Sequence, residues 1–475
     1  MEATFDFGMI GIGVMGSNLL LNMADNGFAV VGYDLKQERA NKLEAAANEG
    51  TIVKGTTDIQ VLVQSLKKPR KLMMLVPAGK PVDDVINTLL PHIEEGDIVI
   101  DGGNSYYKDT QRRFGDLQPK GIHFFGMGVS GGEAGARFGP SMMPGGDKEA
   151  YQYLKPILEA IAAKADNHPC VAYMGNGAAG HYVKMVHNGI EYAMMQLISE
   201  AYDLLKRGGG FSNDDLHYVF ARWNSGSLQS FLIQITAEVF RTLDAEAKNN
   251  KVYLVDVILD KAGSKGTGKW TSQDAMDIPV SIPTIDMAVA MRDLSVEKEL
   301  RTQAGKLYQP QVKKIDMPDE ALAGLLEEAL SFCFVMAYAQ GLSLLAKASE
   351  AYSMQIPLAS VVSIWKGGCI IRSSLLYQFD KAFAANKTLP NVLLDESIAS
   401  FLRSKDQAGR KLVSLAVESR IPVAAMSSAV SYFDAFCSER LPVNLIQAQR
   451  DFFGAHTYQR LDREGVFHTE WQASE

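Results

Sequence analysis

The sequence predicts an open α/β sheet followed by a large all-helical region and a C-terminal tail. Two observations support this fold class. Residues 7–34 read as strand, glycine turn, helix and strand, and long helical periods replace strand signals after Ala179. Regular alternation of strands and helices is typical of a parallel, Rossmann-type sheet with helices on its faces. We therefore expect a dinucleotide-binding domain over residues 1–178, a helical domain over residues 179–440 and a tail over residues 441–475.

The elements of the expected sheet can be located one by one. A short apolar strand covers residues 7–11, the glycine turn follows, and a helix covers residues 17–26. Short apolar stretches next to turn or polar residues indicate the later strands. These strands are expected at residues 28–33, 71–76 and 98–100 and near Phe124 and Val171.

Two parts of the helical region echo each other. Residues 201–207 precede Trp223-x-x-Gly226 much as residues 342–347 precede Trp365-x-x-Gly368, and Ser, Leu or Ile follow in both. A duplicated helical unit would explain this similarity, and chance similarity between helices explains it about equally well.

Residues 329–346 are uncharged and long enough to span a bilayer. They include the polar residues Ser331, Gln340 and Ser343. A helix that is buried on all sides in a large helical core has the same composition, and we favour that interpretation. We therefore expect no membrane partner.

Composition narrows the class of protein. An apolar fraction of 47% with 21% charged residues describes a soluble globular protein, and the N-terminus shows no secretory signal. The net charge of −8 gives no broad basic surface, so we expect no nucleic acid partner and a local cationic pocket for any anionic substrate. The four cysteines are scattered, which fits free thiols in a reducing cytoplasm rather than disulfides or a zinc site.

The glycine turn has the spacing of a dinucleotide-binding motif. Residues 11–16 read Gly-Ile-Gly-Val-Met-Gly between a predicted strand and a predicted helix, and Asp34 lies 18 positions after the last glycine. Such a turn lets a pyrophosphate approach the backbone at a helix N-terminus, while the acidic residue accepts hydrogen bonds from the ribose. Purely structural turn glycines are the alternative, and the surrounding strand and helix make it the weaker one.

Asp34 also bears on the choice of cofactor. A carboxylate at this position repels the 2′-phosphate of NADP and favours NAD, whereas Lys36 and Arg39 nearby could reverse this preference by binding the phosphate. Leu35 directly after the acidic residue offers no charge. We therefore expect NAD.

Residues 180–192, Gly-His-Tyr-Val-Lys-Met-Val-His-Asn-Gly-Ile-Glu-Tyr, carry the candidate chemistry. On a helix, Lys184, His187, Asn188 and Glu191 fall at i, i+3, i+4 and i+7 and share one stripe. A solvated stripe of charged residues is the more frequent meaning of such a pattern. Here the dinucleotide motif upstream and the anion-binding residues downstream favour a base and an acid acting on one substrate.

Two glycine-containing loops are candidate ligand sites. Residues 101–105 read Asp-Gly-Gly-Asn-Ser at the end of a predicted strand, so Asn104 could bridge cofactor and substrate. Ser130-Gly131-Gly132 offers a hydroxyl and free amides that suit a carboxylate. A plain turn and a flexible loop are the respective alternatives.

Residues 265–270, Lys-Gly-Thr-Gly-Lys-Trp, resemble a nucleoside-triphosphate loop only superficially. Trp270 stands where that loop needs a metal-binding Ser or Thr, so we reject a nucleoside triphosphatase. We retain Lys265 as a ligand of a substrate phosphate, with Arg292 and Arg450 as further candidates and His456 as a hydrogen-bonding group. Each of these side chains alone is more often an ordinary surface residue.

Six segments in order give the chain a family resemblance. They are GIGVMG from Gly11, IDGGN ending at Asn104, GVSGGEAGA from Gly128, GHYVKMVHNGIEY from Gly180, KGTGKW from Lys265 and RDFFGAHTY from Arg450. From about Phe7 to Tyr458 the chain resembles the decarboxylating 6-phosphogluconate dehydrogenases of the β-hydroxyacid dehydrogenase superfamily. A chance coincidence of all six segments in this order is not credible.

The resemblance implies oxidation and decarboxylation of 6-phosphogluconate to ribulose 5-phosphate and carbon dioxide, a step of the pentose phosphate pathway. It implies NAD or NADP as cofactor and no metal. Lys184 would take the proton of the third-carbon hydroxyl and then stabilise the enediolate, and Glu191 would protonate the first carbon. The implied substrate ligands are Asn104, Ser130, Gly131, Gly132, His187, Asn188, Tyr192, Lys265 and Arg292, with Arg450 and His456 supplied by the neighbouring subunit of a homodimer.

Two positions depart from the family pattern at the cofactor. Members that use NADP typically carry Asn-Arg-Thr or Asn-Arg-Ser after the second strand, where this chain has Asp34-Leu35-Lys36, and Pro77 replaces a frequent lysine. The first departure removes the guanidinium that would clasp the 2′-phosphate, which fits the expectation of NAD. The expected cofactor contacts are Gly11, Ile12, Gly13, Val14, Met15, Gly16, Asp34, Leu35, Lys36, Val76, Pro77, Ala78 and Asn104.

Two other functions remain open. The chain could be a β-hydroxyacid dehydrogenase for another small hydroxy acid, but the candidate phosphate ligands Lys265, Arg292 and Arg450 argue against an unphosphorylated substrate. It could also be a non-catalytic dinucleotide-binding protein, which would not need Lys184 and Glu191 on one stripe.

Overall fold

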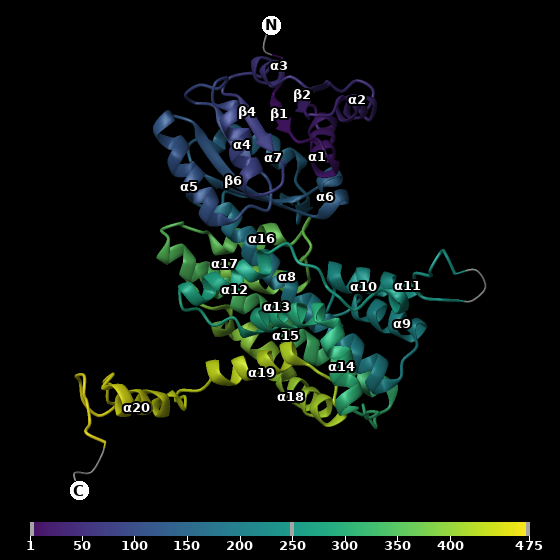
Figure 1. Ribbon diagram of the computed structural model, residues 1–475, viewed down its shortest axis with the longest axis vertical. Coiled ribbons are helices and arrows are strands. Elements are labelled where there is room, and N and C mark those ends of the chain that lie inside the picture. The colour runs from purple at the N-terminus through teal and green to yellow at the C-terminus, as the bar shows by residue number, and fades with distance from the viewer. Residues whose placement is uncertain (1–3, 248–250, 472–475) are drawn as a thin grey trace. The chain divides into compact units, whose positions relative to one another are not determined.

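A computed structural model describes residues 4–247 and 251–471 of the chain. Its contacts divide the chain into two compact units, Met1–Ala429 and Val430–Glu475. The first unit contains a mixed sheet near the N-terminus and a large set of helices after it (Figure 1).

Seven strands form one sheet in the order β3-β2-β1-β4-β5-β6-β7. All neighbouring pairs are parallel except β6 and β7, which are antiparallel. The sequence order reverses on either side of β1, which is where open α/β sheets bind ligands. The strands are β1 (Phe7–Ile10), β2 (Val30–Tyr33), β3 (Val53–Thr56), β4 (Lys71–Met74), β5 (Ile98–Asp101), β6 (His123–Ser130) and β7 (Ser141–Gly146), with a separate pair β8 (Lys164–Ala165) and β9 (His168–Pro169).

Alternating side chains of the strands enter two apolar cores. In β5, Ile98 and Ile100 belong to one core and Val99 to the other, as the period of a strand requires. The first core includes side chains of α1 (Val14–Asp25) and α7 (Tyr151–Ile161). The second includes side chains of α3 (Ile59–Gln64), α4 (Lys80–Leu89) and α5 (Tyr107–Leu117), so helices cover both faces of the sheet (Figure 1).

Most strands expected from the sequence are confirmed, but the count was wrong. The strand expected third is the fourth, because the short β3 precedes it at the edge of the sheet. The antiparallel β7 was not expected either, and Val171 makes only an isolated bridge with Met142. Neither β3 nor β7 has an apolar strand pattern, since one contains Lys54 and Gly55 and the other Pro144 and two glycines. Pairing with a neighbouring strand overrides this weak local preference.

Helices dominate the first unit after residue 179. The two longest are α8 (Ala179–Asp203), which continues into a π-helical turn at Leu204–Gly209, and α15 (Asp319–Ala351). Other helices of the described chain are α2 (Gln37–Ala45), α6 (Gly132–Phe138), α9 (Asn213–Trp223), α10 (Phe231–Arg241), α11 (Leu254–Val257), α12 (Thr267–Asp277), α13 (Pro283–Val296), α14 (Lys298–Tyr308), α16 (Leu358–Trp365), α17 (Leu375–Ala385), α18 (Glu396–Ser419) and α19 (Ala424–Phe436), with 3-10 turns at Gln118–Lys120 and Val392–Leu394.

The long apolar helix lies within the protein. Of the described helices, α15 alone is long and apolar enough to cross a membrane, and 89% of its most apolar window is buried inside the structure. This burial supports the interpretation of residues 329–346 as a core helix.

The two echoing segments occupy matching places in the helical region. Trp223 and Trp365 are fully buried, and each ends a helix, α9 and α16. The chain that follows forms an antiparallel bridge between Ser230 and Ser373, just before α10 and α17 begin. The segments are therefore neighbours in space as well as similar in sequence.

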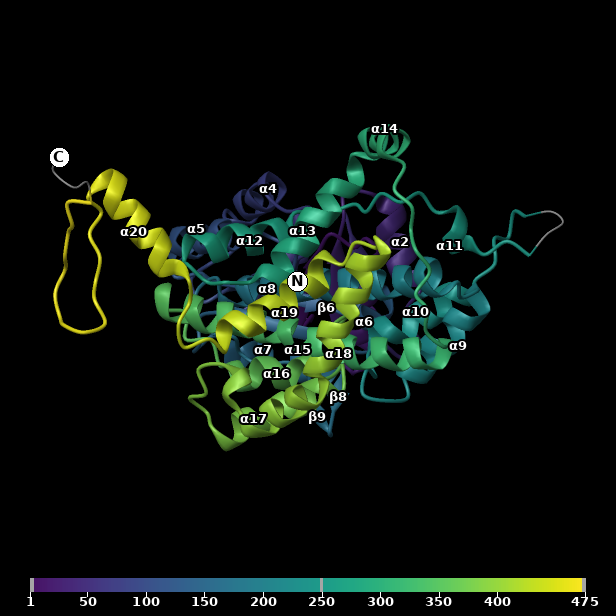
Figure 2. The ribbon, with the colours of Figure 1, turned by 90° about the horizontal axis from the view of Figure 1, so that it is seen from below.

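The second unit contains α20 (Val443–Gly454), which is followed by a long loop (Figure 2). Within this loop Tyr458 and Phe467 form an isolated antiparallel bridge. Asp451 is the buried centre of this unit and accepts hydrogen bonds from the backbone of Thr457 and Thr469 and from the indole of Trp471. Several large apolar side chains remain exposed on and around α20, namely Leu441, Val443, Leu445, Ile446, Phe452 and Phe453.

Candidate active site

Glycines bring α8 against the end of the sheet. A methyl group on Gly180 would lie 2.1 Å from the carbonyl oxygen of Gly126 in β6. A methyl group on Gly128 would lie 2.4 Å from Cβ of Lys184. Since any larger side chain would separate helix and strand, these glycines place Lys184 next to the loop that follows β6.

One pocket of about 600 Å³ lies beside this contact. Its walls come from the glycine turn, the loops after β5 and β6, α8, the start of α12, α13 and the segment after α16. The lining residues are Met15, Asn104, Val129, Ser130, Gly131, Gly132, Lys184, Asn188, Glu191, Tyr192, Gly263, Ser264, Lys265, Thr267, Arg292 and Ile370. The expected substrate ligands of the first unit thus gather here, except His187, which is fully buried and bonded to the lining residue Ser130.

Lys184 and Glu191 are the amine and the carboxylic acid that α8 presents to the pocket. Lys184 is only 7% exposed, and burial lowers the pKa of its ammonium below the usual 10.5, although the charge of Glu191 opposes this shift. Burial likewise raises the pKa of Glu191 above 4.5, against the effect of Lys184 and Arg292. Burial therefore favours the neutral form of both groups. A base and an acid on one rigid helix can move protons at two points of one ligand.

His187 connects the helix to the glycine loop. Burial holds the pKa of its imidazole well below 6.5, so the ring is neutral. The neutral ring fits a chain in which its Nδ1 donates to Asn188 Oδ1 at 3.1 Å and its Nε2 accepts from Ser130 Oγ at 3.2 Å. Ser130 Oγ in turn accepts from the amide of Ile370 at 3.4 Å. These hydrogen bonds fix the Ser130 side chain and leave the side-chain NH2 group of Asn188 available to the pocket.

A second part of the pocket is cationic. The guanidinium of Arg292 stacks on the ring of Tyr192, with 3.6 Å between the guanidinium carbon and the ring centroid. Helix α12 begins at Thr267, shortly after Lys265, and no side chain caps its first turn. Uncapped backbone N–H groups beside a lysine and an arginine form a site that suits a phosphate group.

The glycine turn borders a separate hollow of about 430 Å³. A methyl group on Gly16 would lie 2.1 Å from the carbonyl oxygen of Gly11, whereas one on Gly13 would meet nothing within 4 Å. The turn is therefore closed on its inner side and open where a pyrophosphate approaches. Helix α1 begins at Val14 without a side-chain cap, so its first N–H groups are available to that anion. These features fit a bound dinucleotide.

The wall of this hollow contains the acidic residue at the end of β2. Asp34 forms an ion pair of 3.0 Å with Arg39 and accepts a hydrogen bond from the amide of Lys36, while the side chain of Leu35 is 86% exposed. The hollow is lined by Ile10, Gly11, Gly13, Tyr33, Asp34, Leu35, Arg39, Ile59, Leu75, Val76, Pro77, Asp84, Val85 and Thr88. Of the other expected cofactor contacts, Ile12 and Gly16 are buried within the turn, and Val14, Lys36 and Ala78 are exposed and do not line the hollow.

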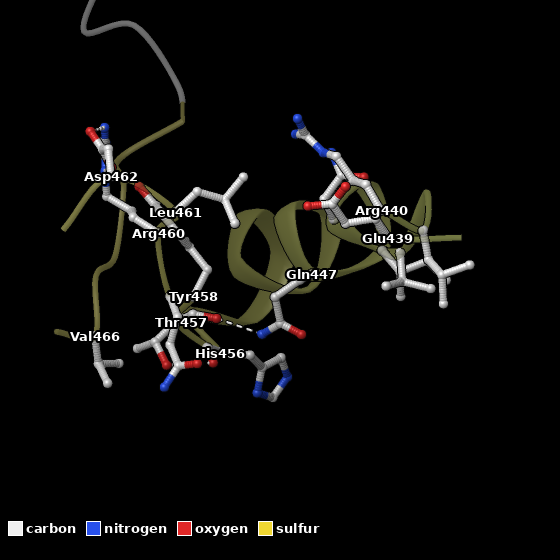
Figure 3. A pocket seen from close by; sticks show the side chains of 15 residues that line it. Glu439, Arg440, Gln447, His456, Thr457, Tyr458, Arg460, Leu461, Asp462 and Val466 are labelled. Carbon is white, nitrogen blue, oxygen red and sulfur yellow. Dashed lines mark hydrogen bonds and ion pairs between the residues drawn. The ribbon is translucent and has the colours of Figure 1, made fainter. Parts of the chain in front are cut away.

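Arg450 and His456 belong to the second unit and do not line the pocket around Lys184. Arg450 donates to Gln447 Oε1 at 3.3 Å within α20. His456 lines a hollow of about 1060 Å³ that is formed by the second unit alone, where Gln447 donates to the carbonyl of Thr457 (Figure 3).

The pocket also contains residues that the sequence did not single out. Val129, Gly263, Ser264, Thr267 and Ile370 line it. Thr267 lies inside the Lys-Gly-Thr-Gly segment and could have been included on that ground. Ile370 gives no local signal, because it reaches the pocket only through the folding of a distant segment onto the loop at Ser130.

Together, a dinucleotide-type turn and a buried lysine next to a carboxylic acid define a nicotinamide-dependent dehydrogenase. The model of the NAD binding domain of 6-phosphogluconate dehydrogenase matches residues 6–175, and the model of the C-terminal domain of the same enzyme matches residues 180–471. The chain belongs to the 6-phosphogluconate dehydrogenase family.

Relatives of full length agree with this assignment. The chain is 50% identical to the NADP(+)-dependent, decarboxylating 6-phosphogluconate dehydrogenase of Bacillus subtilis, over 98% of both chains. It is 47% identical to the decarboxylating enzyme of Lactococcus lactis, over 99% of both chains. The solved structure of Plasmodium falciparum 6-phosphogluconate dehydrogenase, studied with NADP+ and with 6-phosphogluconate, matches at 44% identity and a TM-score of 0.94, covering 98% of this chain and 100% of that one.

Proposed function

We propose that the chain oxidises 6-phosphogluconate and releases carbon dioxide, giving ribulose 5-phosphate and a reduced nicotinamide cofactor, as a step of the pentose phosphate pathway. The observation that carries this proposal is the pocket in which a buried lysine and a carboxylic acid lie with the cationic residues Lys265 and Arg292. The cationic part favours a phosphorylated substrate over other small hydroxy acids. The lowered pKa of Lys184 argues against a purely non-catalytic role.

In this reaction the residues of α8 handle the protons. A nicotinamide cofactor held at the glycine turn would supply the acceptor for the hydride that leaves the third carbon. Neutral Lys184 removes the proton from the hydroxyl of that carbon, and the resulting β-keto acid can then lose carbon dioxide because the new carbonyl accepts the electrons. The ammonium of Lys184 stabilises the developing enediolate, and protonated Glu191 delivers a proton to the first carbon. The pKa shifts of both groups support these roles.

The remaining lining residues bind the two ends of the substrate. Asn104, Ser130, Gly131, Gly132, His187 and Asn188 hold the carboxylate and the neighbouring hydroxyls, His187 acting through Ser130 and Asn188. Tyr192, Lys265 and Arg292 hold the phosphate, together with the uncapped start of α12. The donors required for an anion are therefore present within the first unit.

We further propose a homodimer in which Arg450 and His456 complete the site of the partner subunit. The exposed apolar side chains on and around α20 support an association of this kind, because such residues are usually covered.

We also propose domain bounds of 1–178, 179–440 and 441–475. A cytoplasmic location is proposed as well, because Cys170, Cys333 and Cys369 are buried free thiols, which suits a reducing compartment.

We propose NAD as the preferred cofactor. An acidic residue at the end of the second strand of such a fold would repel a 2′-phosphate, and Arg39, which also lines the hollow, is already paired with Asp34. Lys36 does not line the hollow. The preference is tested by comparing kcat/KM for NAD and NADP in the natural chain and in the double variant Asp34→Ala with Leu35→Arg. We expect the double variant to shift toward NADP, and an unchanged ratio would show that Asp34 does not set the preference.

The proposed reaction is tested by a direct assay. Purified protein is mixed with 6-phosphogluconate and either NAD or NADP, and reduced nicotinamide is followed by absorbance while carbon dioxide is trapped. Equal amounts of both products are expected. No reduction with either cofactor would contradict the proposal, and reduction without carbon dioxide would indicate a simple hydroxy acid dehydrogenase.

A further inference from the structure

Arg113 on α5 is a buried arginine with an unusual set of partners. Its side chain is 2% exposed, and its Nε and one terminal nitrogen bind both carboxylate oxygens of Asp83 at 2.8 and 3.2 Å. The same terminal nitrogen donates to the carbonyl of Gly79 at 2.9 Å. The other terminal nitrogen lies 3.5 Å from Asp101 Oδ2. One guanidinium thus joins α4, the loop before it and the end of β5.

Both of these loops border the ligand sites. Gly79 closes the segment after β4, in which Val76 and Pro77 line the hollow beside the glycine turn. Asp101 opens the loop that carries Asn104 into the pocket. The two loops also lie close together, since a methyl group added to Gly103 would be 3.3 Å from the carbonyl oxygen of Val76.

Asp101 connects the Arg113 guanidinium to the loop that carries Asn104. Its Oδ1 accepts from the amide of Gly103 at 3.1 Å, and its Oδ2 accepts from the hydroxyl of Ser105 at 2.6 Å. Asn104 therefore lies between two residues that the same carboxylate fixes. Because Arg113 approaches Oδ2, a change in the guanidinium alters the orientation of the carboxylate and hence of this loop.

We propose that Arg113 is a positioning residue that holds the two cofactor-facing loops in their binding arrangement. It touches neither cofactor nor substrate, and it acts through Gly79 on Val76 and Pro77 and through Asp101 on Asn104. This inference rests on the proposed function, because it takes these loops to contact the dinucleotide. A buried arginine that only stabilises the fold would be expected to weaken all ligands alike when changed.

The neighbouring arginine provides a matched control. Arg112 also binds Asp83, at 2.9 Å, but it is half exposed, and its other ion pair, with Asp116, lies within α5. Arg113→Lys and Arg112→Lys both keep the charge and lose the fork of donors. Dissociation constants are measured directly, by fluorescence for NADH and NADPH and by calorimetry for 6-phosphogluconate, with kcat and thermal unfolding alongside.

We expect Arg113→Lys to weaken binding of the reduced dinucleotide by about tenfold and to lower kcat, because the loops lose their common anchor. Binding of 6-phosphogluconate, which has many other ligands, should change by less than about threefold. Arg112→Lys should leave all three quantities near those of the natural chain. Equal cofactor affinities in the two variants would overturn the proposal, as would a parallel loss of both ligands with a lowered melting temperature.

A rescue experiment separates positioning from folding. A hollow of about 260 Å³, lined in part by Asp83, Arg112 and Arg113, lies beside the guanidinium. We expect guanidinium ion at millimolar concentration to restore cofactor affinity to Arg113→Ala and to leave Arg112→Ala unchanged. If Arg113→Ala does not fold, Arg113→Lys still decides the question, and failure of both to fold would show a structural role only. Because dinucleotide binding is measured without turnover, these outcomes do not depend on the natural chain being active on 6-phosphogluconate.

Discussion

The two long helices α8 and α15 are both deeply buried, yet they differ in what their polar residues contact. The polar stripe of α8 faces a pocket, where Lys184 and Glu191 have shifted pKa values. In α15 both the oxygen and the nitrogen of the buried Gln340 side chain are hydrogen-bonded within the core: the oxygen accepts from the amide of Thr284 and the nitrogen donates to its hydroxyl, at 2.9 Å each. Burial alone therefore does not make a site. A binding site requires buried polar groups that are not all hydrogen-bonded within the protein and can therefore bind a ligand.

The two helices also have different roles, because α15 packs directly against α8, which carries the polar residues of the pocket. A methyl group on Gly341 of α15 would lie 2.5 Å from the side chain of Ile190, the residue before Glu191. The helices thus cross at a distance that a glycine permits. We expect changes in α8 to affect turnover most and changes in α15 to affect mainly stability.

The largest effect is expected for Lys184→Met. Loss of the base should lower kcat by about a thousandfold or more while substrate affinity changes little, because the other ligands remain. Steady-state kinetics and calorimetry with 6-phosphogluconate measure the two quantities. Near-normal turnover would exclude Lys184 as the base. It would also contradict the expectation that changes in α8 affect turnover more than changes in α15.

Glu191→Gln should have the next largest effect. The amide keeps the shape but cannot deliver a proton, so we expect kcat to fall by about a hundredfold or more. Trapped carbon dioxide and reduced nicotinamide, measured together in single turnovers, show which step is slowed. A variant that decarboxylates and reprotonates at the natural rate would rule out Glu191 as the acid.

A shift in pH dependence should accompany this variant. When Glu191 is ionised, its negative charge raises the pKa of Lys184, so replacing it by Gln lowers that pKa further. In the proposed mechanism neutral Lys184 is the active form, and activity is lost as pH falls through its pKa. The acidic limb of kcat/KM should therefore move to lower pH in Glu191→Gln. A limb that stays in place or moves to higher pH would show that another group controls it.

In α15, Gly341→Ala tests the support of α8. The added methyl group meets Ile190, so we expect a loss of about 1–3 kcal/mol in the free energy of unfolding and a several-fold lower kcat. Gly324→Ala is the matched control in the same helix, since nothing lies within 4 Å of its added methyl group. That control should gain up to about 1 kcal/mol through helix propensity. Equal responses of the two variants would contradict a tight crossing at Gly341.

The smallest effect on turnover is expected for Gln340→Met. Thr284 loses both hydrogen bonds with Gln340, which should cost about 1–3 kcal/mol of stability by denaturant unfolding. The kcat should stay within about twofold, because no pocket residue is touched. A large loss of kcat at unchanged stability would mean that the polar groups of α15 do take part in the site.

Local patterns carried much of the sequence-based prediction. The glycine turn, the polar stripe of α8 and the core position of α15 follow from residue spacing within one segment. The edge strand β3 could not be predicted, because Val53-Lys-Gly-Thr becomes a strand only by pairing with β2. Arg113 and Ile370 were missed for a related reason, since their partners lie far away in the chain or in another element. The pairing of Arg39 with Asp34, five residues earlier, depends on the turn between β2 and α2.

The contact between the segment after α16 and the glycine loop has a consequence for the integrity of the enzyme. The carbonyl of Gly368 accepts the amide of Ser141, and a methyl group on Gly131 would lie 2.6 Å from that carbonyl oxygen. The later helices therefore act as a scaffold for a loop that precedes them by more than two hundred positions. A fragment truncated before α15 would keep Lys184 and Glu191 but lack the segment that packs against the Ser130-Gly131-Gly132 loop. Lengthening either loop should likewise be tolerated only with a compensating change in the other.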